Sequence, residues 1–244
     1  MLSLFKAKPK LFELIPAGYV DIHSHVLPRI DDGAKTMEDT RFLLDGMAQL
    51  GFSKSITTPH TMGNVWDNTS ETIKEALKAV HATVPIPAQA LNLQAASEYF
   101  LDESLMKMIS DKALLTLKDN YVLVEMSYLN APLQLYDFLF ELQLKGYQLI
   151  LAHPERYSFL HGKKKEYAKL KKAGCMFQLN LLATVGYYGK DVCEIADYLL
   201  KEDCYDFVGS DIHHAQHLAS FDKKIKISNP KILEQVMAKN QFFK

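Results

Sequence analysis

Short apolar runs alternate along the chain with longer stretches in which apolar residues recur at helical spacing. The runs predict strands near residues 19–22, 54–58, 91–97, 121–125, 148–152, 176–180 and 206–210. The intervening stretches predict helices near 37–50, 69–81, 102–109, 132–145, 163–173, 190–202 and 230–239. Strands that alternate with helices are typical of a parallel sheet. The pattern therefore predicts an α/β protein.

Local signals agree with several of these helix boundaries. Gly51, Gly146 and Gly174 each follow a predicted helix, at the position where glycine commonly ends one. Thr69 or Ser70 can cap the helix that begins there. Seven strand–helix units predict a closed or nearly closed barrel, with its chemistry at the carboxyl ends of the strands.

The chain has 244 residues, which is enough to bury a full core in a single domain. We expect residues 19–244 to form this domain. Residues 1–18 precede the first predicted strand and are expected to form an N-terminal arm, with residues 11–15 packed on the lower face of the barrel.

Charge and hydropathy narrow the class of partner. The formal net charge is −1, with acids and bases interspersed, so we expect no nucleic-acid partner. The lysine-rich segment 163–172 is interpreted as a solvated helix face, because Tyr167, Ala168 and Leu170 give the same helix an apolar side. No run of about 18 apolar residues occurs, so we expect no membrane insertion. Nothing in the sequence indicates an oligomeric state.

The cysteines are expected to be reduced thiols. Cys175, Cys193 and Cys204 are odd in number and lack paired spacing, which favours a cytoplasmic protein. None is followed by arginine six residues later, so the Cys-x5-Arg spacing typical of cysteine-dependent phosphatases does not occur.

Histidines and carboxylates follow the predicted strands in short clusters. Carboxyl ends of parallel strands meet at one rim, so these side chains are expected to converge on a metal centre. A zinc site takes about four ligands and an octahedral site about six, so nine candidates favour two or three ions that share bridging carboxylates. The candidates are His23, His25, Asp32, His60, Glu98, Glu125, His153, Asp211 and His213.

Each cluster taken alone has a simpler interpretation. Asp31 and Asp32 precede a glycine and could form an ordinary turn. His60, which follows a proline, could be a surface residue. Glu98 and Glu125 could form buried salt bridges to lysine or arginine, because a buried carboxylate needs a partner. The recurrence of such clusters at successive strand ends favours metal binding.

Six segments resemble, in order, motifs of the polymerase-and-histidinol-phosphatase (PHP) superfamily. More narrowly, they resemble its bacterial protein tyrosine phosphatase branch, which is associated with capsular and exopolysaccharide synthesis. Asp-Asp-Gly-Ala-Lys-Thr at 31–36 and Ala-His-Pro-Glu-Arg-Tyr at 152–157 separate this branch from histidinol phosphatases and polymerase-associated domains. The remaining matching segments are 21–28, 58–60, 97–99 and 210–213.

The resemblance implies a PHP fold, which is a distorted TIM-like (β/α)7 barrel. It implies three divalent ions bound by the nine candidates, most often manganese, with iron or zinc also suited to the donors. It also implies that Arg156 binds phosphate, for which a surface salt bridge with Glu155 is the alternative. Two positions depart from the branch: Arg29 stands where glycine is usual, and Thr61 where a second histidine is common.

The resulting hypothesis is a protein tyrosine phosphatase in which a metal-activated hydroxide hydrolyses phosphotyrosine. The expected substrate is the tail of a bacterial tyrosine autokinase that regulates capsule or exopolysaccharide synthesis. Asp21 is expected to orient a ligand histidine or a water, and either a metal-bound water or His214 to protonate the leaving phenolate. Four tyrosines could flank the substrate ring or simply pack: Tyr128, Tyr157, Tyr187 and Tyr188.

Three other functions are compatible with the same residues. A small-molecule phosphomonoesterase, acting on histidinol phosphate or a sugar phosphate, would use the same centre. A nuclease is disfavoured by the lack of a basic groove. A metal-binding regulator without turnover is disfavoured by the complete set of ligands.

Overall fold

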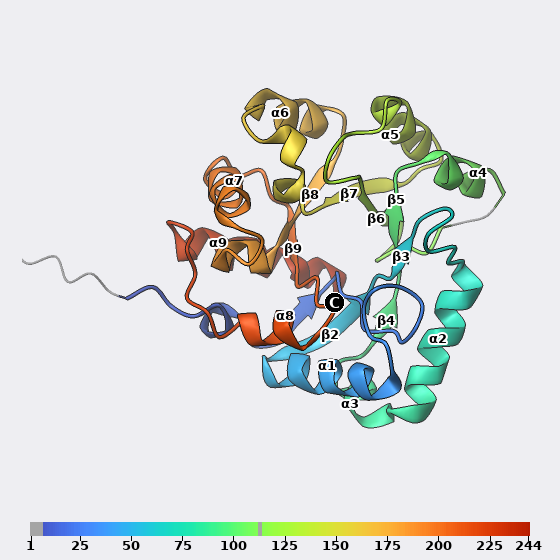
Figure 1. Ribbon diagram of the computed structural model, residues 1–244, viewed down its shortest axis with the longest axis vertical. Helices are drawn as coiled ribbons and strands as arrows, with labels where there is room; N and C mark the ends of the chain where they lie inside the picture. The colour runs from blue at the N-terminus through green and yellow to red at the C-terminus, as the bar shows by residue number, and fades with distance from the viewer. Residues whose placement is uncertain (1–6, 112–113) are drawn as a thin grey trace, which may run out of the picture.

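The computed structural model describes residues 7–111 and 114–244, in which parallel strands form two sheets surrounded by helices (Figure 1). One sheet has the order β1-β2-β4, and the other has the order β3-β5-β6-β7-β8-β9. The strands are β1 (Tyr19–Asp21), β2 (Phe52–Thr57), β3 (His60–Thr61), β4 (Gln94–Ala95), β5 (Glu98–Phe100), β6 (Tyr121–Glu125), β7 (Gln148–Ala152), β8 (Met176–Asn180) and β9 (Phe207–Gly209). The predicted α/β class with a parallel sheet is confirmed.

Two of the predicted strands are interrupted. The strand predicted at 54–58 is β2, and the chain continues past Pro59 as the separate strand β3. The strand predicted at 91–97 is β4, and Glu98 begins β5 rather than closing the preceding strand. Two hydrogen bonds connect the two segments across the breaks, from Ala96 N to Thr57 O (2.9 Å) and from Glu98 N to Pro59 O (3.1 Å). The breaks move β3 and β5 into the six-stranded sheet.

β9 and β1 are joined without a ladder between them. Ser24 and Ile212 form a single parallel bridge beyond the ends of the two strands. The side-chain amide of Asn240 donates to the carbonyl oxygens of Val20 and Val208, each at 2.8 Å. The described strands therefore form two sheets and not one continuous closed ladder.

Most predicted helices are present within a few residues of their expected ends. Thr69, rather than Ser70, caps α2, with its Oγ1 accepting from Thr72 N at 3.3 Å. The six-residue helices α3 and α8 were not predicted, because so short a segment has no measurable helical period. The helices are α1 (Met37–Gln49), α2 (Ser70–Thr83), α3 (Pro85–Ala90), α4 (Glu103–Asp111), α5 (Leu135–Leu144), α6 (Lys164–Lys172), α7 (Lys190–Lys201), α8 (Ala215–Ser220) and α9 (Pro230–Lys239). None of the helices in the described ranges combines the length and apolar character that crossing a membrane requires.

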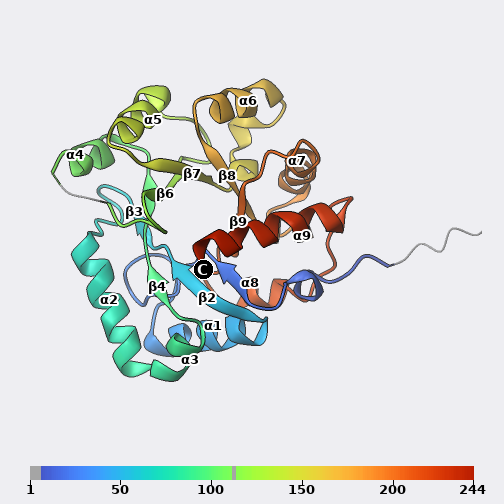
Figure 2. The ribbon, with the colours of Figure 1, turned by 180° about the vertical axis from the view of Figure 1, so that it is seen from behind.

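The C-terminus closes one end of the space between the strands (Figure 2). Phe243 is fully buried, with its ring centroid 4.8 Å from that of Phe207 and 6.1 Å from that of Tyr121. Phe207 and Tyr121 are the first residues of β9 and β6. This plug therefore lies at the amino ends of the strands and leaves the opposite, carboxyl rim available for a site.

The described part of the predicted N-terminal arm packs beside the segment that follows α8. Leu11 and Leu14 are buried on a 3-10 helix, η1 (Leu11–Leu14). Leu11 N donates to Lys223 O, and Phe12 N donates to Phe221 O, each at 3.0 Å. Residues 1–6 of the predicted arm lie outside the described residues.

Candidate metal centre

The structure brings all nine predicted metal ligands together at the carboxyl rim. They come from the loops after β1, β7 and β9, from the starts of β3 and β5, and from the end of β6. They form four overlapping groups, in each of which one donor atom per residue lies within 4.8 Å of the others. The groups are His25, Asp32, His60 and His213; His23, Glu98 and His153; His23, His25 and Asp211; and His60, Glu98 and Glu125.

Glu98 is the central residue of these groups. Its Oε2 lies 3.1 Å from His23 Nε2 and 3.2 Å from His60 Nδ1. The same oxygen is 3.4 Å from His25 Nε2, and Oε1 is 3.1 Å from His153 Nε2. The side chain is fully buried, and its ion-pair partners in the described part of the chain are histidines rather than lysine or arginine. A carboxylate so placed can bridge two ions.

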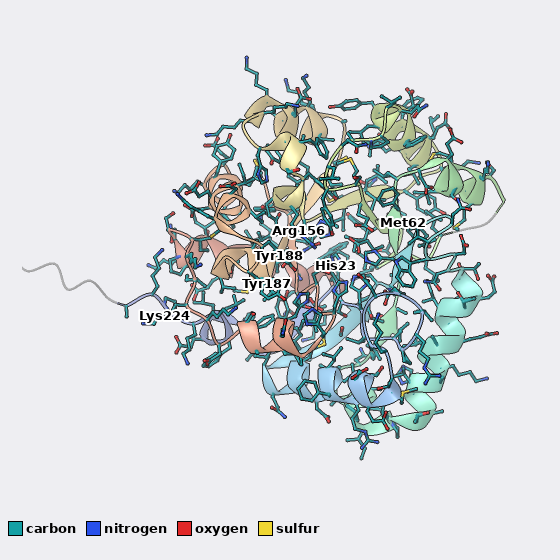
Figure 3. All side chains as sticks on the ribbon, viewed as in Figure 1. His23, Met62, Arg156, Tyr187, Tyr188 and Lys224 are labelled. Carbon is teal, nitrogen blue, oxygen red and sulfur yellow. The ribbon has the colours of Figure 1, made fainter. Side chains whose placement is uncertain are left out.

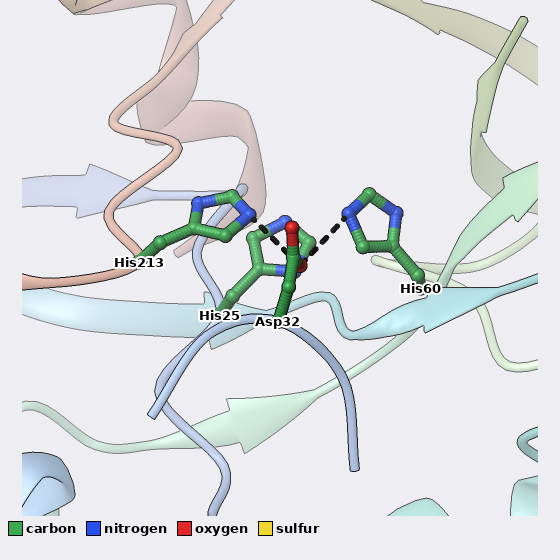
Figure 4. A group of neighbouring side chains, drawn as sticks. All are labelled: His25, Asp32, His60 and His213. Carbon is green, nitrogen blue, oxygen red and sulfur yellow. Dashed lines mark ion pairs between the residues drawn. The ribbon is translucent and has the colours of Figure 1, made fainter. Parts of the chain in front are cut away.

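Asp32 occupies the open side of the centre (Figure 4). Its Oδ1 is 3.5 Å from His60 Nε2 and 3.5 Å from His213 Nε2. The rings of His25 and His213 are stacked, with centroids 3.9 Å apart. Asp32 is 57% exposed, so this group faces solvent while the Glu98 group is buried.

The donors fit a set of divalent cations. Within the described ranges, the buried atoms Glu98 Oε1, Glu125 Oε1 and His60 Nδ1 have no hydrogen-bond partner. Glu125 Oε1 and His60 Nδ1 are nevertheless only 2.8 Å apart, in a geometry that does not make a hydrogen bond. An unsatisfied buried polar group costs about 1–3 kcal/mol. Cations with mixed nitrogen and oxygen preference, such as manganese, iron or zinc, would remove this cost.

Two residues outside the predicted set orient the ligand rings. His23 Nδ1 lies 2.8 Å from Gln178 Oε1, and His25 Nδ1 lies 2.7 Å from Asp31 Oδ2. Because both oxygens accept, each ring carries its proton on Nδ1 and turns Nε2 toward the centre. Asp31 had been interpreted only as part of a turn. Gln178 could have been recognised as a polar residue within an apolar run.

Electrostatics keep the carboxylates ionised. Burial would raise the pKa of Glu98, but His23 and His60 outweigh burial and hold it well below its usual value. Burial would lower the pKa of His60, but Glu98 and Glu125 raise it to about 10. The pKa of Asp211 is likewise held low against burial, chiefly by His23. Ionised carboxylates and neutral imidazoles are the forms that bind cations, so an ion bound here would displace the proton of His60.

A hollow of about 220 Å³ opens beside the candidate ligands and is lined by Asp32, His60 and His153. Arg156 lines the same hollow, and Figure 3 labels its side chain. Its Nη1 donates to Asp211 Oδ2 at 2.9 Å. The guanidinium lies between two tyrosine rings, 4.4 Å from the centroid of Tyr128 and 4.1 Å from that of Tyr188. Glu155 points elsewhere and accepts from the Tyr205 hydroxyl at 2.9 Å. The alternative of a surface salt bridge between Arg156 and Glu155 is therefore wrong.

Comparisons with known proteins identify the family. Residues 19–239 match a family model described as capsular polysaccharide synthesis, CpsB/CapC. The chain belongs to the CpsB/CapC family. The family resemblance predicted from the motifs is thus confirmed.

The relatives of this CpsB/CapC protein include tyrosine phosphatases. The tyrosine-protein phosphatase YwqE of Bacillus subtilis is 27% identical over 198 residues, covering 81% of this chain and 78% of the relative. The tyrosine-protein phosphatase CpsB of Streptococcus pneumoniae is 27% identical over 201 residues, covering 80% and 83%. A solved structure from work on these two metal-dependent tyrosine phosphatases superimposes with a TM-score of 0.76 at 25% identity, covering 88% of this chain and 86% of that one. An amidohydrolase from Mycoplasma synoviae, 12% identical with a TM-score of 0.53, shares the fold alone and covers 96% and 90%.

Asp21 contacts the backbone around the centre rather than a ligand side chain. Its Oδ1 accepts from Ser210 N and its Oδ2 from Ser210 Oγ, each at 2.8 Å. Ser210 Oγ also lies 3.1 Å from His23 O, and Asp211 N donates to His23 O at 2.8 Å. Within the described ranges of this CpsB/CapC member no hydrogen bond joins Asp21 to a ligand ring, so the predicted direct contact with a histidine is wrong, and the predicted role toward a water stays a prediction. Asp21 instead fixes the segments that carry His23 and Asp211.

His214 lies at the exposed end of the hollow, and a second histidine supports it. The centroids of the His214 and His217 rings are 4.0 Å apart. His217, which was not predicted, faces Asp211 O with Nδ1 at 3.0 Å. Burial lowers the pKa of His217 to about 3, so this ring is neutral. In the sequence, His217 could have been recognised only by its spacing of four residues from His213.

The four tyrosines differ in whether they line the hollow. Tyr128 and Tyr188 line the hollow with Arg156. Tyr157 is fully buried and its hydroxyl donates to Ala152 O at 2.9 Å, so it packs. Tyr187 lies behind Tyr188, with ring centroids 5.0 Å apart.

The two departures from the branch have local explanations. Arg29 has a φ of 65°, in the left-handed region where glycine is unstrained, and its Nε donates to Lys35 O at 3.3 Å. Thr61 pairs its hydroxyl with that of Ser97 at 2.7 Å, so it ties β3 to the start of β5.

Proposed function

We propose that this CpsB/CapC family member is a metal-dependent protein tyrosine phosphatase that hydrolyses phosphotyrosine. The observation that carries the proposal is a fixed guanidinium 2.9 Å from Asp211, inside the cluster of donors. Arginine binds two phosphate oxygens at once, and divalent ions neutralise the others. The names of the relatives, tyrosine-protein phosphatases, support the same reaction.

The nine donors are proposed to hold three divalent cations, most often manganese. When bound, such ions polarise phosphoryl oxygens and lower the pKa of water from 15.7 to about 7. Three divalent cations against four carboxylates leave a net positive charge, which suits a phosphomonoester dianion. The four carboxylates are Asp32, Glu98, Glu125 and Asp211.

The chain's own residues position the phosphate and assist the leaving group. Tyr128 and Tyr188 lie against the Arg156 guanidinium, which lines the hollow where phosphate would be bound. A phenolate leaves with a pKa of about 10, so it needs less acid assistance than an alkoxide. His214, at the exposed end of the hollow, is the proposed proton donor to the phenolate oxygen.

The fold and the partner complete the proposal. The order of the strands and the TM-score of 0.76 support a distorted (β/α)7 barrel of the PHP type, formed by residues 19–244 after an arm at 1–18. The family description supports a substrate in capsule synthesis, for which the tail of a tyrosine autokinase is our candidate.

The test is phosphate release from a phosphotyrosine peptide by metal-stripped protein resupplied with manganese. We expect activity that returns with the metal and is lost in His153→Ala and strongly reduced in Arg156→Ala. Histidinol phosphate, assayed in parallel, addresses the small-molecule alternative. Folded, metal-loaded protein that hydrolyses histidinol phosphate and leaves the peptide intact would overturn the proposal.

A further inference from the structure

Three hollows adjoin one another, beginning at the carboxyl rim. The hollow that contains Arg156 shares Asp32, His213 and His214 with a second hollow of about 240 Å³. The second shares Phe42 and Ala215 with a third, of about 600 Å³. Because neighbouring hollows share lining residues, they lie in a row, here called the groove, that leads from the donors along α1 to Leu50.

The outer part of this groove lies between α1 and α8, which run side by side in both views of the fold (Figures 1 and 2). The α1 wall uses positions three and four apart, which lie on one face of a helix. A Cβ added at Gly46 would lie 2.6 Å from Leu218 Cδ1, so the two helices meet there and form the floor. The α1 positions are Phe42, Asp45, Gly46, Gln49 and Leu50.

The length of the groove matches a short peptide. Positions 42–50 of a helix span about 12 Å at a rise of 1.5 Å per residue. An extended chain covers about 3.3 Å per residue, so roughly four residues of a polypeptide would occupy this wall. A small phosphomonoester would leave it empty.

Phe42 is the apolar contact in the middle of the groove. It lines both outer hollows and is 57% exposed, whereas its α1 neighbours Leu43, Leu44 and Met47 are buried in the core. The fold therefore does not need the ring of Phe42 for packing. An exposed phenylalanine that faces a groove beside a catalytic centre is a contact available to a ligand.

The inner hollow is lined by charges of both signs, Lys35 and Asp39, whereas Asp45 is the charged residue on the outer wall. Lys35 lies at the inner end of the groove, where its Nζ is 3.3 Å from Asp31 O. The exposed carboxylate of Asp45 lies on the outer wall. The groove thus suits a ligand with an anionic group at the donors, an apolar group at Phe42 and a basic group further out.

We propose that this groove binds the segment of the substrate polypeptide adjoining the phosphotyrosine, with an apolar side chain against Phe42 and Leu218 and a lysine or arginine near Asp45. The inference rests on the proposed function, because the phosphate held beside Arg156 anchors the segment. It deepens that function by naming a sequence preference of the substrate.

The test compares three phosphotyrosine peptides with p-nitrophenyl phosphate as the reference substrate of each protein. One peptide carries leucine and arginine after the phosphotyrosine, one carries them before it, and one has only glycine and serine. We expect kcat/KM for one of the first two to exceed that of the third about tenfold, equivalent to about 1.4 kcal/mol. Phe42→Ala removes this preference, and Asp45→Asn removes the part due to arginine. Phe140→Ala, at a ring 58% exposed on α5 outside the groove, keeps it.

The possible outcomes distinguish a failure of the groove proposal from a failure of the phosphatase proposal. If wild-type protein hydrolyses the three peptides equally, or Phe42→Ala keeps the preference, the groove does not bind substrate and the phosphatase proposal stands. If no phosphotyrosine substrate is hydrolysed, the phosphatase proposal itself fails. A concentration-dependent association that Phe42→Ala abolishes, with an unchanged preference, would assign the groove to a second copy of the chain and overturn the inference.

Discussion

Asp211 joins Arg156 to the cluster of candidate metal donors: Arg156 Nη1 donates to its Oδ2 at 2.9 Å, while its Oδ1 lies 3.3 Å from His23 Nε2 and from His213 Nδ1. The carboxylate holds the guanidinium at a fixed distance from the proposed ions. An arginine placed in this way can contact phosphate without displacing a ligand. We therefore expect the proposed phosphate binding by Arg156 and the proposed metal binding to be separable by mutation.

Replacing Arg156 should lower activity without emptying the centre. We expect Arg156→Ala to reduce kcat/KM for a phosphotyrosine peptide by about 10²–10³-fold, because a charged donor to the phosphate is lost. Metal content should stay near that of wild type, since Asp211 keeps a hydrogen bond from Asn180 Nδ2 at 2.7 Å. Arg156→Lys keeps the charge and loses the planar fork of the guanidinium. Its kcat/KM should therefore lie between that of wild type and that of Arg156→Ala. Loss of metal in Arg156→Ala would contradict this separation.

Removing the metal should destabilise the protein. The clustered carboxylates lose their counter-charge, and a ligand present at 100 times its Kd contributes about 2.7 kcal/mol. For a chain of this size we expect Tm to fall by about 5–10 °C with a chelator and to recover with manganese. Calcium, which avoids imidazole, serves as the control. An unchanged Tm after verified metal removal would show that the bound ions do not stabilise the folded state.

Glu98 and Asp32 should differ in their effect on metal content. Glu98 belongs to two donor groups and is buried, whereas Asp32 belongs to one and is largely exposed. We expect Glu98→Gln to lose more bound metal per chain than Asp32→Asn, as measured by plasma mass spectrometry on folded protein. Equal losses would argue against Glu98 as a bridging ligand.

Thiol alkylation should leave activity intact. Burial raises the pKa of the Cys175 thiol to about 12. At pH 8 a group with that pKa is ionised in only about one molecule in 10⁴, and the thiolate is the reactive form. Raising the pH to 9 ionises an ordinary thiol but leaves Cys175 protonated. Iodoacetamide should modify the partly exposed Cys204 first, with peptide mass spectrometry as the readout and urea-unfolded protein as the control. Inactivation in step with alkylation would contradict the metal mechanism.

The C-terminal plug should be important for stability. Phe243 is fully buried, whereas the adjacent Phe242 is 40% exposed. We expect Phe243→Ala to lower the free energy of unfolding by about 3–5 kcal/mol. Phe242→Ala should have a clearly smaller effect. Urea denaturation of both variants tests the difference, and similar values would show that the plug does not support the strands.

The sequence by itself determined the local features of this protein. Apolar runs and helical periods identified most strands and helices, because side-chain burial along one element follows a short repeat. Eight of the nine candidate ligands stand in short clusters next to such runs, so the parallel arrangement predicted their convergence, whereas Asp32 depends on the turn that follows His25. Thr69 capped its helix because capping depends only on neighbouring residues.

Only the tertiary structure decided the contacts between distant segments. β3 consists of the two polar residues His60 and Thr61, which no apolar run marks, so the switch of sheets after Pro59 is visible only in the backbone hydrogen bonds. Gln178 orients His23 across 155 positions of the chain, and no local repeat encodes such a pair. The groove beside Phe42 likewise depends on how α1 meets the short helix α8. Periodicity reports burial along one element, whereas orientation and clefts arise where separate elements pack.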